Sequence, residues 1–363
     1  MEHTYESITM IKIGLVGLPK SGKTTIFNAV TGSDAEVSDY YSGLTKPNLG
    51  TVEVKDARVD YLADVCNPKK TVYATIEYLD FVGIHHDEEK REIFSNEALG
   101  IIRMVNALGL VIRGFNLPSS PPAPQKDVET LETEFLFSDL AICEKKLESV
   151  SKQYHKGGKD PEIEKELSLF QKCYDCLSQQ KMLSTLDLND QEEKLLRGFQ
   201  FLTRKPMFII LNVDEERFGK NQEFKSRFSD HYKIVEIAGK FEMELQQLDE
   251  EEAKEFMEEY NIRESAVNKL TRISYDTLGL ISFFTMGPAE VHAWTLRKGE
   301  TALDAAGEIH TDLARGFIRA ERFTYDDFRK YGSEKELKAA GKFHLEGKQY
   351  VVKDGDIILI RHN

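Results

Sequence analysis

Short apolar runs alternate with polar stretches through the first 240 residues. Five runs have the length and composition of buried or half-buried strands, namely residues 11–16, 71–79, 107–115, 206–211 and 233–237. A helical pattern follows the first run, from Thr25 onward. Residues capable of chemistry stand at the ends of several runs: Gly17, Asp80, Asn212 and Ala238. Since ligands bind outside the carboxyl ends of strands in open α/β sheets, this pattern predicts an α/β domain with one site along that edge.

A different pattern fills the chain between the third and fourth runs. It opens with the proline-rich segment 118–124, and its apolar residues then recur at spacings of four and three. These residues are Leu136, Leu140, Cys143, Leu147, Val150 and Tyr154, then Ile163, Leu167, Phe170, Tyr174 and Leu177. The glycine-proline turn at 156–161 separates the two series, so the pattern predicts an antiparallel coiled-coil hairpin that projects from the sheet domain.

The pattern changes again near residue 280. Short predicted strands at 291–296 and 350–353 alternate with helical stretches, and Asp354-Gly-Asp356 turns the chain into a final strand at 357–360. A compact α+β module is expected here. The predicted domains are therefore 10–124 with 201–279 for the sheet domain, 125–200 for the helical insertion, and 280–363 for the last module.

Composition and charge narrow the classes of function. The chain has 363 residues, 40% hydrophobic and 30% charged, which describes a globular protein of two or three domains. Its net charge of −14 repels nucleic acid from the surface as a whole. Any RNA contact must therefore be local, and no autonomous DNA binding is expected. The last module contains 13 Lys and Arg against 13 Asp and Glu, which favours protein docking over RNA binding.

The sequence predicts a cytoplasmic protein without a membrane span. No apolar run approaches the roughly 20 residues that a span needs, and residues 1–9 are too polar for a secretory signal. Four cysteines are too few and too irregularly spaced for a disulfide framework. Cys173 and Cys176 form a CxxC within a predicted helix, but neither a second pair nor histidines accompany them, so they are interpreted as helix positions rather than a metal site.

The sharpest motif is Gly17-Leu-Pro-Lys-Ser-Gly-Lys-Thr24, which matches the Walker A pattern between a predicted strand and a predicted helix. In such loops, backbone N–H groups and a helix N-terminus surround phosphate oxygens. The candidate phosphate-binding residues are Gly17, Leu18, Pro19, Lys20, Ser21, Gly22, Lys23 and Thr24. Lys23 is expected to contact the β- and γ-phosphates as a catalytic residue, and the Thr24 hydroxyl to bind Mg²⁺.

A magnesium-nucleotide site also needs a carboxylate near the metal. Asp80, at the end of the second predicted strand and three residues before Gly83, is the candidate. Thr45 precedes this strand in a loop and is a second candidate for both Mg²⁺ and catalysis. As a lone loop threonine it has an equally ordinary interpretation.

Base selection is predicted at Asn212-Val-Asp-Glu215. GTPases of this architecture usually present Asn-Lys-x-Asp, whose aspartate accepts two guanine donors. Glu215 is one methylene longer and Val213 replaces the lysine, so the sequence favours ATP. Asp214 leaves GTP open as the alternative, because a shift of one residue would offer it to guanine.

These residues resemble the YchF or Obg-like ATPase family, and the resemblance covers nearly the whole chain. It rests on residues 14–24, 45–48, 67–70, 212–215 and 237–245, and at the end on 291–296, 306–312, 316–320 and 352–356. The resemblance implies a GTPase-like P-loop domain, a coiled-coil arm and a C-terminal TGS domain of the ubiquitin-like β-grasp fold. It also implies hydrolysis of ATP or GTP and association with ribosomes or translation factors. Carried over by position, Gly17 to Thr25 would hold phosphate, Thr45 and Asp80 would attend Mg²⁺, and Asn212, Val213, Glu215 and Ala238 would hold the base.

Two departures from that family bear on the mechanism. Relatives have Asn where Lys20 stands, and in potassium-dependent NTPases that Asn helps to place K⁺. One hypothesis is that the Lys20 ammonium takes the place of this ion, and the alternative is that Lys20 points to solvent. The segment 84–94 lacks the glycines of its relatives. Ile84 occupies the place where Ras-like enzymes have a water-orienting glutamine; the relatives also have an apolar residue there, which cannot position water by itself, so slow hydrolysis is expected. His85 or His86 could orient water, although solvated histidines are the simpler interpretation.

Three functions follow, in order of preference. The first is a slow Mg²⁺-dependent ATPase that acts as a switch on ribosome or translation components. The second is a nucleotide-loaded adaptor with little hydrolysis, and the third is a GTPase.

Overall fold

The computed structural model describes residues 10–35, 47–81, 93–118, 120–157, 160–246, 248, 251–252, 255, 257 and 264–363. They divide into two compact units. The larger unit contains Lys12–Gly50 and Tyr78–Ala266, and the smaller contains Thr51–Glu77 and Val267–Asn363.

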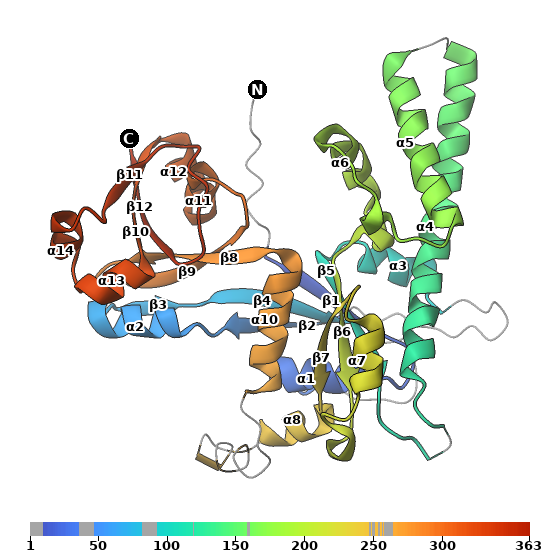
Figure 1. Ribbon diagram of the computed structural model, residues 1–363, viewed down its shortest axis with the longest axis horizontal. Helices are drawn as coiled ribbons and strands as arrows, with labels where there is room; N and C mark the ends of the chain where they lie inside the picture. Colours follow the sequence, from blue (N-terminus) through green and yellow to red (C-terminus); the bar gives the residue numbers. More distant parts are fainter. Residues whose placement is uncertain are drawn as a thin grey trace. The chain divides into compact units, whose positions relative to one another are not determined.

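A six-stranded sheet of order β2-β4-β1-β5-β6-β7 forms the framework of the predicted sheet domain (Figure 1). Its strands are β1 Lys12–Val16, β2 Asn48–Val54, β4 Ala74–Asp80, β5 Ala107–Arg113, β6 Met207–Asn212 and β7 Lys233–Ile237. The pairs β1–β5, β5–β6 and β6–β7 are parallel. Their carboxyl ends therefore meet at one edge, as the sequence predicted.

The central strands are apolar on both faces because helices cover both sides. Leu108, Leu110 and Ile112 of β5 share a cluster with Val128 and Phe135 of α4. The other helices of this unit are α1 Lys23–Thr31, α3 Asn96–Ile102, α6 Asp190–Leu196, α7 Gln222–Phe228 and α8 Gly239–Leu245.

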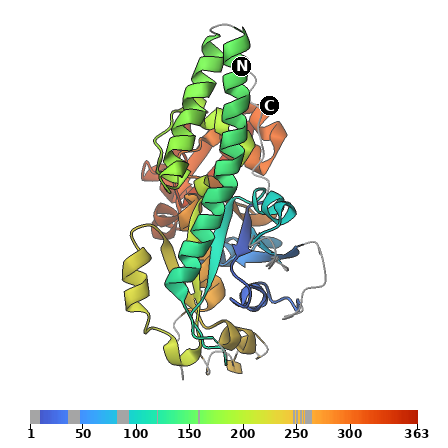
Figure 2. The ribbon, with the colours of Figure 1, turned by 90° about the vertical axis from the view of Figure 1, so that its right-hand side faces the viewer.

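The insertion forms the predicted hairpin of two long helices. Helix α4 spans Pro124–Gly157 and α5 spans Pro161–Ser178, and Figure 2 shows them running antiparallel beyond the sheet. The Asp160 side chain caps α5 by accepting from Glu162 N at 2.9 Å. After α5 the chain continues through η1 Leu183–Thr185, α6, η2 Arg197–Phe199 and η3 Leu202–Arg204.

The packing of this hairpin differs from the predicted seam. Leu169, Cys173 and Cys176 are buried together with Leu183 and Leu196, so the segment after α5 forms a third layer. The apolar residues Leu169, Cys173 and Cys176 of α5 therefore pack against this segment and not only against α4. Of the predicted seam residues, Cys143, Val150, Phe170 and Leu177 are buried. Leu136, Leu140, Leu147 and Tyr174 are half-buried and pack against the cluster that contains Cys143 and Phe170, and Tyr154, Ile163 and Leu167 are also only half-buried.

The second sheet has the order β11-β10-β12-β8-β9-β3. Its strands are β3 Lys70–Val72, β8 Leu280–Met286, β9 Glu290–Arg297, β10 Phe317–Thr324, β11 His344–Glu346 and β12 Asp356–His362. Counted from β8, the C-terminal strands lie in the order 4-3-5-1-2, with β8 parallel to β12 and helix α11 Ala302–Ile309 between the second and third strands. This is the β-grasp arrangement.

Both faces of this second sheet bury apolar side chains. On one face, Phe283 and Ile358 pack with the alanines of α11. On the other face, Phe284 packs with Val59 and Leu62 of α2. The remaining helices here are α2 Ala57–Cys66, α10 Ala266–Leu278, α12 Thr311–Arg315, α13 Tyr325–Tyr331 and α14 Glu334–Ala339.

An ion pair adds to this packing, between Arg58 Nη1 and Asp354 Oδ2 at 2.6 Å. The segment Thr51–Glu77 therefore belongs to the smaller packing unit. Packing units and functional domains need not coincide, so the domain limits given above stay a prediction.

The observed elements differ from the predicted ones in three places. The run 71–79 forms two strands in different sheets, β3 and β4, which Tyr73 separates. Strand β2 and helix α2 were missed, because their apolar residues are interspersed with charges. Residues 350–353 are not a strand: Tyr350 Oη and Lys353 N both donate to Asp356 Oδ2, which closes a turn. Among the described residues, no helix is both long and apolar enough to cross a membrane.

Candidate functional site

The loop between β1 and α1 depends on two glycines. A Cβ on Gly17 would lie 2.3 Å from Val111 O, and a Cβ on Gly22 would lie 2.2 Å from Asn212 Nδ2. Gly22 also has a φ of 85°, which favours glycine. Among the residues that the structure describes, no side chain caps the N-terminus of α1, so its first N–H groups can receive an anion.

Lys23 reaches back over this loop. Its Nζ donates to Gly17 O at 2.9 Å and to Leu18 O at 3.3 Å. Desolvation lowers the pKa of Lys23 to about 8, although the charge of Asp80 opposes this shift. The ammonium group is therefore held by two carbonyls that a bound phosphate group would replace.

Thr24 and Asp80 meet beside Lys23, although 56 residues separate them in the sequence. Thr24 Oγ1 donates to Asp80 Oδ2 at 2.8 Å, and Asn48 Nδ2 donates to the same oxygen at 3.4 Å. Asp80 Oδ1 is buried and has no hydrogen-bond partner among the described residues. Burial raises the pKa of Asp80 more than Thr24, Lys23 and Asn48 lower it. A buried carboxylate oxygen without a donor, next to a threonine hydroxyl, fits a hard cation such as Mg²⁺.

Asn48 was missed as a site residue. The feature that could have identified it is its position in the segment 45–48, one of the segments that carry the family resemblance. Its amide donor orients the carboxylate that would bind the metal.

Asn212 connects the phosphate loop to the loop after β7. Its Nδ2 donates to Ser21 O at 3.0 Å, and its Oδ1 accepts from Gly239 N at 3.2 Å. The side chain is 4% exposed, so both of its polar atoms are engaged in hydrogen bonds inside the protein. Its structural contacts therefore differ from the direct base contact that the sequence suggested first.

The other predicted base-site residues have different environments. Val213 is buried in the sheet cluster, so its side chain is part of the core. Asp214 Oδ1 accepts from Arg217 N at 3.0 Å and caps η4 Glu215–Arg217. Glu215 is exposed, and Ala238 ends the loop that Asn212 holds.

A further hydrogen bond joins the loop after β6 to the loop after β5. Arg217 Nη2 donates to Asn116 Oδ1 at 3.1 Å, which links η4 to the loop after β5. No pattern in the sequence pointed to Arg217.

The remaining phosphate-loop candidates lie along the turn. Pro19 and Lys20 are exposed, Leu18 and Thr25 are half-buried, and Lys20 has a left-handed φ of 63°. Ser21 is buried, and its Oγ has no hydrogen-bond partner among the described residues. The candidates Thr45, Gly83, Ile84, His85 and His86 lie outside the described residues.

Three of the four cysteines, Cys143, Cys173 and Cys176, are buried. Burial raises the pKa of Cys143 to about 12 and that of Cys173 to about 11. Such thiols are weak nucleophiles and poor metal ligands at neutral pH. In the described part of the chain, no group of three metal-ligating side chains was found.

Two family models match separate parts of the chain. The model described as "50S ribosome-binding GTPase" matches residues 12–146. The model YchF-GTPase_C, described as "Protein of unknown function (DUF933)", matches residues 280–363.

Curated relatives match over nearly the full length. The "Ribosome-binding ATPase YchF" of Escherichia coli O157:H7 is 38% identical over 356 residues, which are 96% of this chain and 98% of the relative. The protein of the same name from Bacillus subtilis is 38% identical over 364 residues, with the same coverage. Among solved structures, the Schizosaccharomyces pombe YchF GTPase matches with a TM-score of 0.84 and 29% identity, covering 97% of each chain.

Proposed function

The chain belongs to the YchF family of P-loop NTPases, and from this premise we propose that it is a Mg²⁺-dependent nucleoside triphosphatase that hydrolyses ATP slowly. Its nucleotide state would control binding to the ribosome. The observation that supports this function best is the group formed by Lys23, Thr24 and Asp80, in which a half-buried cation lies beside a buried carboxylate, one oxygen of which has no hydrogen-bond partner among the described residues.

The proposed reaction is attack of water on the γ-phosphate. Gly17 to Thr25 would surround the phosphates, and Lys23 would exchange two carbonyl acceptors for phosphate oxygens. Thr24, Thr45 and Asp80 would hold Mg²⁺, which supplies charge neutralisation when bound. Asn212 would keep the phosphate loop and the base loop in register. Catalysis would then consist mainly of positioning and charge stabilisation.

Single-turnover hydrolysis of ATP tests this function. Removing the ammonium group in Lys23→Ala should lower the rate by at least about a hundredfold, since one charge contact to the transition state is worth several kcal/mol. Lys240→Ala removes an exposed lysine of α8 and is the matched control, with an unchanged rate expected. Equal rates for native protein and Lys23→Ala would rule out the enzyme assignment. Tight nucleotide binding without phosphate release would instead favour the adaptor alternative.

The preference for ATP over GTP is supported by the environment of Asp214. Its carboxylate already accepts from Arg217 N, so a shift that offers it to guanine would break the cap of η4. Glu215 is then the acidic residue left at the base loop. Competition between ATP and GTP for the purified protein decides between the two nucleotides. A GTP preference would support the alternative that this protein is a GTPase.

Ribosome binding is proposed from the relatives, whose names state this activity, and it would place the protein in the cytoplasm. Co-sedimentation of the protein with ribosomes in the presence of ATP, ADP or no nucleotide tests it. Equal sedimentation in all three conditions would contradict a nucleotide-controlled switch.

A further inference from the structure

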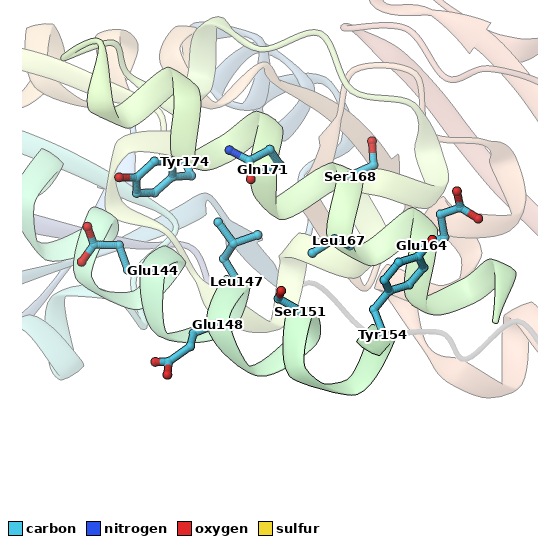
Figure 3. A pocket seen from close by; sticks show the side chains of 10 residues that line it. All are labelled: Glu144, Leu147, Glu148, Ser151, Tyr154, Glu164, Leu167, Ser168, Gln171 and Tyr174. Carbon is cyan, nitrogen blue, oxygen red and sulfur yellow. The ribbon is translucent and has the colours of Figure 1, made fainter. Parts of the chain in front are cut away.

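A groove of about 660 Å³ lies along the α4–α5 hairpin. Its lining residues come from both helices, and Figure 3 shows their side chains around the space between them. They are Glu144, Leu147, Glu148, Ser151 and Tyr154 of α4, and Glu164, Leu167, Ser168, Gln171 and Tyr174 of α5. None of these residues belongs to the nucleotide site, so the proposed function does not account for the groove.

The floor of the groove is apolar. Leu147, Tyr154, Leu167 and Tyr174 follow the spacing of a coiled-coil seam, yet all four are only half-buried. The segment 183–201 covers α5 on the side of Leu169, Cys173 and Cys176. In helical projection, these three residues lie roughly opposite the groove residues of α5. The third layer therefore buries one side of the hairpin and leaves the other side partly uncovered.

The rim of the groove is acidic. Three carboxylates line it, from Glu144, Glu148 and Glu164, and no Lys or Arg is among the ten lining residues. Lys152 pairs with Glu148, so Glu144 and Glu164 supply most of the negative charge. The two helices together contain seven lysines against eleven Asp and Glu residues.

We propose that this groove docks a basic amphipathic segment of a partner protein. An aliphatic side chain of the partner would lie between Leu147 and Leu167, and Lys or Arg side chains would face Glu144 and Glu164. The rings of Tyr154 and Tyr174 offer faces over which such cations are attracted. The volume is within the range that buries several side chains, as in the binding of an amphipathic helix in a groove.

The negative charge of the groove argues against two other occupants, a nucleic acid and a second copy of this chain. A nucleic acid would bring phosphates against three carboxylates. A second copy bound with twofold symmetry would bring the same acidic surface against itself. A basic protein segment is the occupant that complements both the floor and the rim.

Fluorescence anisotropy with the full-length protein tests the proposal. The probe is a fluorescein-labelled amphipathic helix of about five turns, with Leu on one face and Lys on the other. Two further peptides serve as comparisons: a scrambled peptide of the same composition, and one with Glu in place of each Lys. Binding of the Lys peptide alone, weakened when salt is raised from about 50 to about 300 mM, is the expected result.

Paired variants locate the binding. Glu164→Lys reverses a charge on the rim, and Asp187→Lys makes the same change at an exposed position outside the groove. Leu167→Gln changes the floor, and Leu195→Gln makes the same change on the exposed surface of α6. Each groove variant should weaken peptide binding by about tenfold or more, while its partner outside the groove leaves binding unchanged. Circular dichroism of all four confirms that they fold.

Several results would overturn the proposal. They are no binding of the Lys peptide, equal binding of the Glu or scrambled peptide, or equal effects of Glu164→Lys and Asp187→Lys. Binding of labelled poly(U) by the native protein, weakened by Leu167→Gln and unchanged by Leu195→Gln, would assign the groove to RNA. A dimer in sedimentation experiments that Glu164→Lys abolishes would assign it to a second copy.

Discussion

Lys23 shows how one residue links burial, charge and nucleotide binding. Its ammonium group is desolvated, which lowers its pKa to about 8. In the unfolded chain this pKa is near 10.5, so the folded protein loses the proton first as pH rises. Burial of the charged group costs stability below pH 8, and this cost decreases between about pH 8 and 10.5. Phosphate binding, in contrast, needs the protonated form.

We therefore predict that the affinity for Mg·ATP falls above about pH 8. The fall should approach tenfold per pH unit, because the neutral amine must regain its proton before it can bind phosphate. Titration calorimetry at about pH 7.5, 8.5 and 9.5 measures this effect, with proton uptake at the higher values. Lys23→Ala should bind weakly with no such pH dependence. A native affinity that stays flat over this range would contradict the prediction.

Lys20 allows a second prediction at this scale. It is exposed and has a left-handed φ of 63°, a conformation that costs most residues about 1–2 kcal/mol and that Asn tolerates better. If its ammonium replaces a bound potassium ion, turnover of the native protein should be equal in KCl and NaCl. Lys20→Asn should then gain stimulation by potassium. Strong potassium stimulation of the native protein would exclude this role for Lys20.

Glu215 provides a third prediction. It is exposed at the start of η4, and shortening it in Glu215→Asp should improve the fit to guanine. One recovered bidentate contact is worth about 1–3 kcal/mol, or roughly 5- to 150-fold in the ratio of GTP to ATP affinity. Glu216→Asp makes the same change at the adjacent exposed position and should leave the ratio unchanged. The test is competition binding with both nucleotides, and equal ratios for the two variants would contradict this role.

At the scale of elements, the arm is stabilised by a core outside the predicted seam. Phe170 of α5 is fully buried, and its ring contacts Phe199 of η2 edge to face at 5.0 Å between centroids. Cys143 lies across from it on α4, with Sγ 3.4 Å from Phe170 O. The contact between α5 and η2 shows that the segment after the hairpin is part of its fold.

Phe170→Ala should therefore destabilise the larger unit by about 3–5 kcal/mol, through lost burial and the cavity left behind. Phe137→Ala is the matched control, because Phe137 of α4 is 65% exposed and its removal should cost little. Thermal unfolding followed by circular dichroism compares the two variants. Equal midpoints would mean that the arm does not depend on this third layer.

At the scale of the whole molecule, the described residues form two compact units, and the phosphate loop, Asp80 and Asn212 all belong to the larger one. A ligand that binds only the folded state stabilises the unit that contains its site. The net charge of −14 does not prevent nucleotide binding, because the proposed phosphate contact of Lys23 is local.

Mg·ATP at about a hundred times its Kd should stabilise the larger unit by about 2.7 kcal/mol. Calorimetric unfolding should show this as a shift of the transition that Phe170→Ala lowers. The same nucleotide concentration should shift Lys23→Ala much less. An equal shift in both proteins would place the nucleotide at a different site.

Much of this architecture could be predicted from local patterns. The glycine spacing of the phosphate loop, the apolar runs of the parallel strands and the two-helix arm are local features, each set by backbone geometry or by periodic burial. Asp80 and Asn212 could be named because the carboxyl ends of parallel strands meet at one edge of a sheet. Strand β2 and helix α2 were missed because their apolar positions are few and interspersed with charges.

By itself, the sequence determined the class of fold and predicted the chemistry of the site, because both follow from residue types at short spacings. Only the tertiary structure decided which half-buried residues stay uncovered, since that depends on what packs against them. Leu147 and Leu167 are half-buried and line the groove, and Leu147 also packs against the cluster that contains Cys143 and Phe170. The tertiary structure likewise decided the hydrogen bonds between distant segments, those of Asn212 with Ser21 and Gly239 and that of Asn48 with Asp80. No spacing in the chain specifies such contacts, because they arise when separate elements bury their surfaces against each other.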